Sequence, residues 1–304
     1  MADIQANGLR FHVQHLRGGR ASTDRPTVVL VHGLVLDNLS SLYYTLAPPI
    51  ARAGFDVLLY DQRGHGMSDG SPSGYDVDTA VDDLAAVLKA CGVTGPVHLL
   101  GNSYGGLIAL HAAYLHPELV QSLVLVEGQC LDPAHSGHLP GAEGYAGGWV
   151  EDVANTLNLI ALGLECNPLG GDLASRGARK AARMRAGADS LLNRTTLIED
   201  ISTVRLLSPG ELAQVRCPTL ALFGSASNLV ASGPVLASRL PDCTVEVFPG
   251  AAHALLRDAP KELLTSVLRW LETHSPGGPA RRGAHRDVGG YGSRDPGASD
   301  EGAA

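Results

Sequence analysis

One serine of this chain stands in a pattern that fits nucleophilic catalysis. Residues 101–105 read G-x-S-x-G around Ser103, and they join an apolar run at 97–100 to a helical pattern that begins at Tyr104. On a tight turn between a strand and a helix, a serine hydroxyl is exposed at the end of a sheet, and the flanking glycines leave room for the turn. We therefore expect Ser103 to act as a nucleophile.

A serine hydroxyl becomes a good nucleophile when a base removes its proton, and histidine is the usual base. The chain has 12 histidines, and we favour His253 among them. It follows the last strand-like run, at 244–248, and precedes the final helical pattern, so we expect it at the same edge of a sheet as Ser103. The two side chains would then serve as nucleophile and general base.

The elements that must position these residues alternate along the chain. Short apolar runs that favour strands are separated by helical patterns, clearest at 79–91, 104–115 and 261–272. Such alternation predicts an α/β fold with a doubly wound, mostly parallel sheet and right-handed crossovers. The strand-like runs are 10–16, 27–32, 55–60, 97–101, 122–127, 219–223 and 244–248.

One interval interrupts this alternation. Residues 131–215 contain no convincing strand, and a structureless loop of such length is uncommon in a compact domain. We interpret them as a helical cap, or lid, inserted between a first core part at 1–130 and a second at 216–273. Residues 274–304 are rich in Gly, Arg, Asp, Pro and Ser, and we expect a disordered tail there.

Composition and charge limit the expected partners. A chain of 304 residues with a formal net charge of −8 gives no reason to expect nucleic acid or an anionic membrane surface as partner. The five cysteines are widely spaced, and the first residues lack a signal-peptide pattern. Both features lead us to expect a cytoplasmic protein. No apolar run reaches the roughly 20 residues that span a bilayer. Arginine far exceeds lysine, which is typical of a GC-rich bacterial genome.

Four motifs, in chain order, resemble those of the α/β-hydrolase family and extend the likeness over most of residues 1–273. They are VLVHG at 29–33, DQRGHGMS at 61–68, GNSYG at 101–105 and PGAAH at 249–253. The resemblance implies an eight-stranded α/β-hydrolase sheet with an inserted cap. It also implies an oxyanion hole formed by the backbone N–H groups of Leu34 and Tyr104, where the loss of one donor typically costs about 3 kcal/mol of transition-state stabilisation.

The chain departs from this family at the acid of the catalytic triad. Most members carry an aspartate after the strand at 218–223, and Ser227 stands in its place. Glu127, instead, ends the strand at 122–126, where a charged side chain is costly unless it is paired. This placement is similar to that in haloalkane dehalogenases and zearalenone-type lactonases. We therefore expect Glu127 to complete the triad and Ser227 to be dispensable.

Other acidic residues and histidines have separate expected roles. Asp132 is the next candidate for the acid, and we interpret Asp258 as structural. The pair His135 and His138 lacks clustered carboxylates, so we expect no metal site there. The chain carries no glycine-rich nucleotide motif, so we expect no cofactor.

The residues and the resemblance together predict a serine hydrolase of a small, apolar carboxylic ester or lactone, acting through an acyl-enzyme with a Ser-His-Glu triad. Cleavage of a thioester or of a carbon–carbon bond would use the same groups. Two other classes stay open. One is a non-hydrolytic member, such as a cofactor-free oxygenase or cyclase, in which Ser103 only positions the substrate. The other is a ligand receptor that keeps the fold and the triad.

Overall fold

The computed structural model describes residues 2–19, 25–128, 130 and 186–275. Most of the expected cap, with Asp132, His135 and His138, lies outside the described residues, as does the expected tail from residue 276 onward. The domain boundaries therefore stay a prediction.

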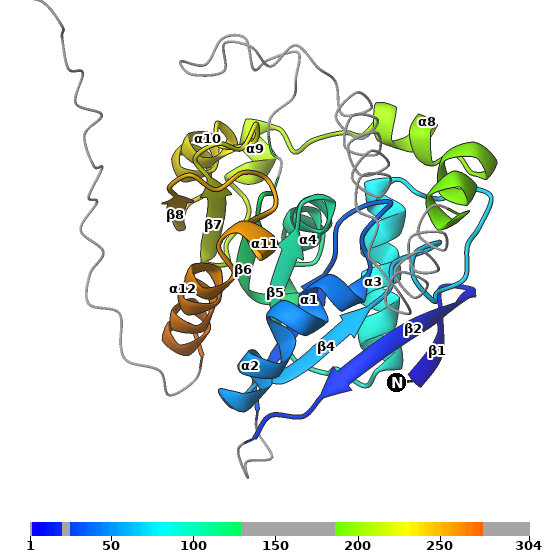
Figure 1. The fold of residues 1–304 in the computed structure, drawn as a ribbon, viewed down its shortest axis with the longest axis horizontal. Helices are drawn as coiled ribbons and strands as arrows, with labels where there is room; N and C mark the ends of the chain where they lie inside the picture. Colours follow the sequence, from blue (N-terminus) through cyan, green and yellow to red (C-terminus); the bar gives the residue numbers. More distant parts are fainter. Residues whose placement is uncertain (1, 20–24, 129, 131–185, 276–304) are drawn as a thin grey trace, which may run out of the picture.

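A single sheet of eight strands forms the centre of the molecule, in the order β1-β2-β4-β3-β5-β6-β7-β8 (Figure 1). β1 pairs with β2 and β2 with β4 in antiparallel fashion, and the remaining neighbours are parallel. The predicted doubly wound, mostly parallel sheet is confirmed. The strands are β1 (Ala2–Ala6), β2 (Leu9–Leu16), β3 (Thr27–Val31), β4 (Asp56–Tyr60), β5 (Val97–Asn102), β6 (Val120–Val126), β7 (Thr219–Gly224) and β8 (Cys243–Phe248).

The sequence patterns indicated seven of these strands and missed β1. Its side chains are mostly exposed, so the segment lacks the continuous apolar run that marks the central strands. The parallel strands β3, β5 and β6 are buried along most of their length because helices cover both faces of the sheet.

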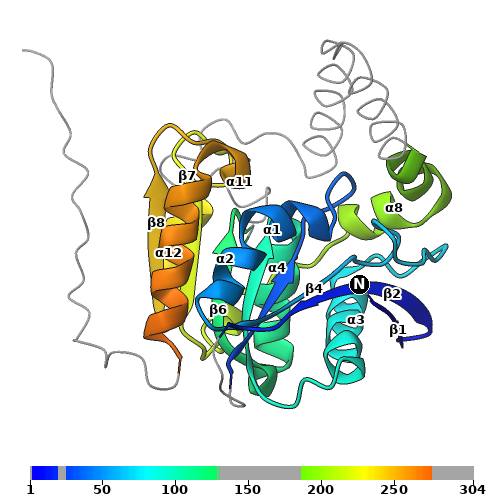
Figure 2. The same ribbon diagram turned by 60° about the horizontal axis from the view of Figure 1, so that its bottom comes forward.

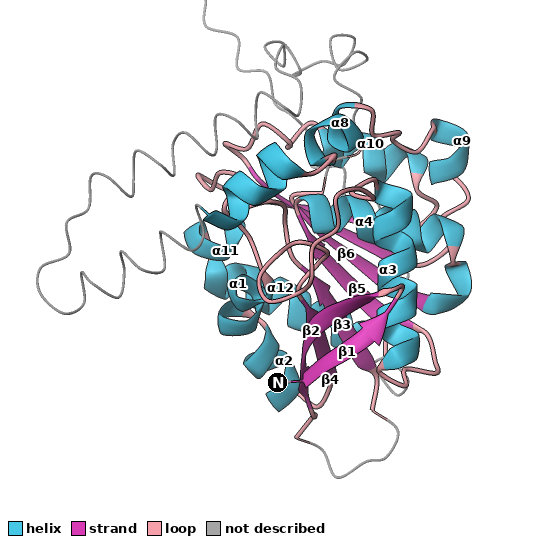
Figure 3. Cartoon of the chain, turned by 90° about the vertical axis from the view of Figure 1, so that its right-hand side faces the viewer, coloured by secondary structure: helices cyan, strands magenta, loops and turns pink. Residues whose placement is uncertain are grey.

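Helices form a layer on each side of the sheet (Figure 3). One apolar core lies between the sheet and α3 (Val77–Ala90), α4 (Tyr104–Leu115) and α10 (Ser232–Arg239). The other lies between the sheet and α1 (Leu39–Thr45), α2 (Ala47–Arg52), α11 (Leu255–Asp258) and α12 (Pro260–Thr273). The short elements η1 (Pro117–Leu119), α8 (Leu197–Ser202) and α9 (Pro209–Leu212), together with the helical residues 186–194, complete the described part. No helix within the described ranges is long and apolar enough to cross a membrane.

The C-terminal helix α12 lies along β8, the last strand of the sheet (Figure 2). Glu246 of β8 accepts hydrogen bonds from Ser266 and Arg269 of this helix, each at 2.5 Å. The contact holds β8, and with it the loop that follows β8 at the carboxyl edge of the sheet. That loop carries His253.

Candidate active site

Ser103 sits on a sharp turn between β5 and α4. Its backbone angles, φ 54° and ψ −119°, are sparsely populated for a residue with a side chain. The Ser103 N–H donates to the Val126 carbonyl at 2.8 Å, which fastens the turn to the neighbouring strand β6. A Cβ at Gly101 would collide with the backbone of Gly105, and one at Gly105 with the carbonyl of Val31. The glycines of the G-x-S-x-G motif are thus required by close packing of backbone on backbone.

Three side chains form a hydrogen-bonded chain at the carboxyl edge of the sheet. His253 Nε2 lies 3.1 Å from Ser103 Oγ, and His253 Nδ1 lies 3.3 Å from Glu127 Oε2. Asn102 and Val126 are paired across β5 and β6, so Ser103 and Glu127 leave the sheet side by side. The structure therefore brings together the three residues that the sequence indicated, within reach for proton transfer.

The Glu127 carboxylate is buried and fully hydrogen-bonded. It is 0% exposed, and its Oε1 accepts the Gly224 N–H at 2.6 Å. Its Oε2 accepts the Ser227 hydroxyl at 2.5 Å in addition to facing His253. These donors offset the loss of water around the charge. The His253 side chain is 44% exposed, so the imidazole is open to a substrate while the carboxylate behind it is shielded.

Asp258 does not contact His253. Its Oδ2 accepts the Ala252 N–H at 3.2 Å, and its Oδ1 pairs with Arg257 at 2.9 Å. The carboxylate thus holds the loop that carries the histidine, as expected of a structural residue.

Ser227 was expected to be dispensable, and the structure places its hydroxyl on Glu127. The two residues are separated by 100 positions along the chain. The local pattern around Ser227 contains no signal for the contact, which arises only because β6 and β7 are neighbours in the sheet.

The loop after β3 approaches the elbow at Gly33, the residue before Leu34, where an added Cβ would lie 3.5 Å from Ser103 Cβ. The Gly33 N–H donates to Asp37 Oδ2 at 2.7 Å, and the Leu36 N–H donates to the Leu34 carbonyl at 2.8 Å. Tyr104 is the first residue of α4, where the backbone N–H groups of a helix lie beyond the reach of its own carbonyls. Tyr104 directly follows Ser103 and Leu34 directly follows Gly33, and the oxyanion hole that the resemblance implies stays a prediction.

A family model described as alpha/beta hydrolase fold matches residues 26–260. The chain belongs to the alpha/beta hydrolase fold family. Through this membership the protein is an enzyme of the hydrolase class that acts on small-molecule substrates.

Several curated proteins and solved structures are similar to this hydrolase over most of its length. It is 28% identical over 287 residues to RutD of Pantoea ananatis, named for carbamate hydrolysis, covering 86% of this chain and 95% of that protein. It is also 28% identical over 265 residues to a pimeloyl-[acyl-carrier protein] methyl ester esterase of Chromobacterium violaceum, covering 82% and 96%. A solved membrane phospholipase A, described as a bacterial virulence factor, is 25% identical, with a TM-score of 0.67 and coverage of 90% and 86%.

Two buried histidines support the loop after β3 of the hydrolase. Burial, with His32 close by, lowers the pKa of His65 to about 3. Its Nε2 can therefore accept the Val35 N–H at 2.8 Å while its Nδ1 donates to the Arg63 carbonyl at 2.8 Å. The His32 ring accepts the Gln62 N–H at 2.9 Å. The DQRGHGMS motif is thus a structural support of the candidate oxyanion loop.

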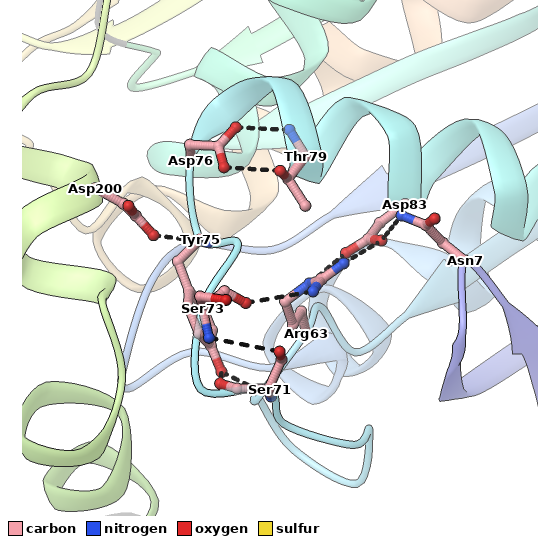
Figure 4. Close-up of polar contacts among 9 residues, drawn as sticks. All are labelled: Asn7, Arg63, Ser71, Ser73, Tyr75, Asp76, Thr79, Asp83 and Asp200. Atoms are coloured by element: carbon pink, nitrogen blue, oxygen red, sulfur yellow. Dashed lines mark hydrogen bonds and ion pairs between the residues drawn. The ribbon is translucent and has the colours of Figure 1, made fainter.

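A second polar cluster of the hydrolase lies beside this motif (Figure 4). Arg63 donates to both carboxylate oxygens of Asp83, at 2.9 and 2.8 Å, and Asn7 donates to Asp83 at 2.6 Å. Asp200 of α8 accepts the Tyr75 N–H at 2.9 Å. These contacts tie the loop before α3 to the core and to α8, and none of them involves the Ser103–His253–Glu127 chain.

The hydrolase contains another serine–histidine contact, between Ser122 Oγ and His98 Nδ1 at 2.7 Å. Both residues are buried near the amino-terminal ends of β6 and β5, whereas Ser103 follows the carboxyl end of β5. Trp270 Nε1 also donates to Ser122, at 3.2 Å, and Ser275 Oγ lies 3.0 Å from His98 Nε2. Burial lowers the pKa of His98 to about 4. We interpret this contact as an anchor for the end of α12.

Proposed function

We propose that this α/β hydrolase is a serine hydrolase that cleaves a small, apolar carboxylic ester or lactone. Ser103 is the nucleophile, His253 the general base and Glu127 the acid of the triad. The observation that carries the proposal is the hydrogen-bonded chain from Ser103 Oγ through His253 to Glu127 Oε2, at 3.1 and 3.3 Å.

The first half of the reaction forms an acyl-enzyme. Ser103 Oγ attacks the carbonyl carbon as its proton passes to His253 Nε2, and Glu127 stabilises the imidazolium through Nδ1–H. The carbonyl oxygen becomes an oxyanion that accepts hydrogen bonds from the backbone N–H groups of Leu34 and Tyr104. When the tetrahedral intermediate collapses, the imidazolium gives its proton to the leaving alkoxide and the bond to the alcohol breaks.

The second half releases the acid. His253 Nε2 removes a proton from a water molecule, whose oxygen attacks the acyl carbon, and the same N–H groups hold the second oxyanion. Collapse breaks the bond to Ser103 Oγ, which recovers its proton from the imidazolium. In a lactone the alcohol stays attached to the acyl chain, so a single hydroxy acid leaves the site.

The substrate class is supported by the surroundings of the candidate oxyanion loop and by the relatives. Leu34, Val35 and Leu36 pack with apolar residues of the segment 188–201, which favours an apolar substrate. The esterase of Chromobacterium violaceum and RutD are both named for hydrolysis at a carbonyl group. Ester and lactone cleavage requires no group beyond those of the triad and the two N–H donors.

A fluorophosphonate probe with peptide mapping tests the nucleophile. We expect covalent labelling at Ser103, because the probe traps a serine that is activated by a base. The Ser103→Ala variant should lose labelling together with hydrolysis, and Ser122→Ala should keep both. Labelling of Ser122, or full hydrolysis by Ser103→Ala, would overturn the assignment.

A panel of p-nitrophenyl esters, lactones, thioesters and β-diketones of matched size tests the substrate class. We expect turnover of short apolar esters or lactones to exceed that of the other classes in kcat/KM. A clear preference for the diketones or the thioesters would replace the proposed substrate while keeping the triad.

A further inference from the structure

The loop after β7 forms a hydrogen-bonding cradle around the Glu127 carboxylate. In this loop the Gly224 N–H donates to Oε1 at 2.6 Å and the Ser227 hydroxyl donates to Oε2 at 2.5 Å. Both residues are buried. The loop that follows β7 therefore supplies donors to a carboxylate that extends from the neighbouring strand.

The Ser227 hydroxyl has a defined direction. Its oxygen accepts the Leu229 N–H at 3.1 Å, which occupies a lone pair and leaves its single proton for Glu127. The acceptor, Oε2, is the same oxygen that faces His253 Nδ1. Ser227 and His253 thus share one oxygen of the carboxylate, and the rotation of that carboxylate is fixed from two sides.

We propose that Ser227 is a positioning residue that holds Glu127 in the orientation required by His253. The inference rests on the proposed function, in which Glu127 is the acid of the triad. Ser227 acts by fixing Oε2 toward Nδ1 and by drawing part of the negative charge of that oxygen away from the imidazole. Hydrogen bonds to charged groups are about twice as strong as neutral ones, which makes this contact a substantial one.

With this contact in place, a carboxylate at position 227 should be unfavourable. An aspartate there would place a second negative charge against a buried carboxylate that already has its donors. Two like charges in one buried site oppose ionisation of both. A serine in place of the aspartate keeps one charge and converts the position from an acceptor of the hydrogen bond from His Nδ1–H to a donor toward Glu127.

The experiment compares Ser227→Ala with Ser227→Thr, which keeps the hydroxyl. With the ester or lactone that is turned over best, we expect kcat/KM of Ser227→Ala to fall about 10-fold, the lower end of what one hydrogen bond to a charged group contributes. We expect Ser227→Thr to recover most of the loss. Ser238→Ala, which removes a hydroxyl from the nearby helix α10 without touching Glu127, should behave as the unmodified protein.

The pH dependence of kcat/KM separates positioning from mere structural support. Loss of the donor raises the proton affinity of the Glu127–His253 pair, whichever residue holds the proton, so the acid limb should move to higher pH by about half a unit. The other carboxylate of the histidine loop, Asp258, contacts Ala252 and Arg257 and is not altered by the change. If the substitution changed only the stability of the protein, the acid limb of the pH profile of kcat/KM would stay at the same pH.

Two controls keep the outcomes distinct. If Ser103→Ala is inactive while Ser227→Ala retains full kcat/KM and an unchanged acid limb, the role of Ser227 is wrong and the proposed function stands. If Ser103→Ala is fully active, the proposed function is wrong and the inference falls with it.

If Ser227→Ala does not fold, Ser227→Cys preserves the shape with a weaker donor. It should then show the same loss and the same direction of shift, and an unmodified profile would overturn the inference.

Discussion

At the scale of single residues, the candidate site depends on a carboxylate that extends from β6. Glu127 follows the strand beside the nucleophile elbow, and it adopts a left-handed backbone with φ 54°. Its buried carboxylate reaches across the edge of the sheet to His253 and to the loop after β7. The geometry joins an acid at the end of β6 to a base on the loop after β8, and the loop after β7, the strand between them, stabilises the acid.

Replacement of Glu127 by glutamine tests the acid directly. The Glu127→Gln variant keeps the shape of the side chain but cannot stabilise the imidazolium, and loss of the triad carboxylate costs roughly 10,000-fold in kcat in serine proteases. We expect a fall in kcat of about a thousandfold or more, with a smaller change in KM, measured by steady-state kinetics.

Asp258→Asn is the matched control, since it makes the same change in a carboxylate of the histidine loop that does not touch the imidazole. It should retain kcat within a few-fold. A large loss in Asp258→Asn with little effect in Glu127→Gln would transfer the acid role to Asp258.

At the scale of elements, the loop after β3 is held from two sides. On the polar side Asp37 accepts the Gly33 N–H and the Asn38 N–H, and Asp61 accepts the Leu39 N–H at 2.9 Å. On the apolar side the loop packs against α8 and the helical residues 186–194. Val35 within it has φ 60°, a strained value for a β-branched residue, which is kept because these contacts over-determine the loop.

Asp37→Ala tests this support of the candidate oxyanion hole. It removes the acceptor for two N–H groups, so the loop can relax and the Leu34 N–H can leave its position. We expect kcat to fall about tenfold, part of the hundredfold or more lost when an oxyanion donor is removed, with the melting temperature little changed.

Asp37→Asn retains one acceptor oxygen and should show an intermediate kcat. Equal kcat in the unmodified protein and Asp37→Ala would mean that packing against α8 is sufficient to hold the loop.

At the scale of the whole molecule, buried neutral histidines lie in separate parts of the described chain. Burial lowers the pKa of His98 and of His111 to about 4, and that of His65 to about 3. Each ring lies inside packed elements, in β5, in α4 and in the loop after β4. Their charge state is therefore coupled to folding rather than to the reaction.

Stability should fall as pH decreases from about 6.5 toward 4. In that window the unfolded chain protonates these rings and the folded chain does not, so the unfolded state binds more protons and the free energy of unfolding rises with pH. Each histidine contributes up to about 1.4 kcal/mol per pH unit. Urea unfolding at several pH values measures the slope.

His98→Gln, which can still bond to Ser122, is the variant to compare. In this variant the slope of the free energy of unfolding against pH should decrease by the contribution of one histidine. A slope equal to that of the unmodified protein would show that His98 is not responsible.

Much of the fold and of the candidate site was predictable because its signals are local. Strand-like runs, helical periodicity and the glycines of GNSYG each reflect the conformation of a few adjacent residues, and they indicated the doubly wound sheet, the elbow and the position of His253. The departure at Ser227 also indicated that the triad is incomplete or that its acid lies elsewhere, since a neutral side chain cannot take that role. Strand β1 was missed because its exposed residues carry no such signal.

The amino-acid sequence by itself determined the α/β architecture and the trio Ser103, Glu127 and His253, whose catalytic roles are proposals. Only the tertiary structure decided which groups make the supporting contacts: Ser227 donates to Glu127, Asp37 accepts the Gly33 N–H, and His65 accepts the Val35 N–H. The Glu127 and His65 contacts join residues far apart in the chain through the order of the strands. Sequence patterns record which residues favour an element, whereas the partner of a buried polar group depends on how the elements pack.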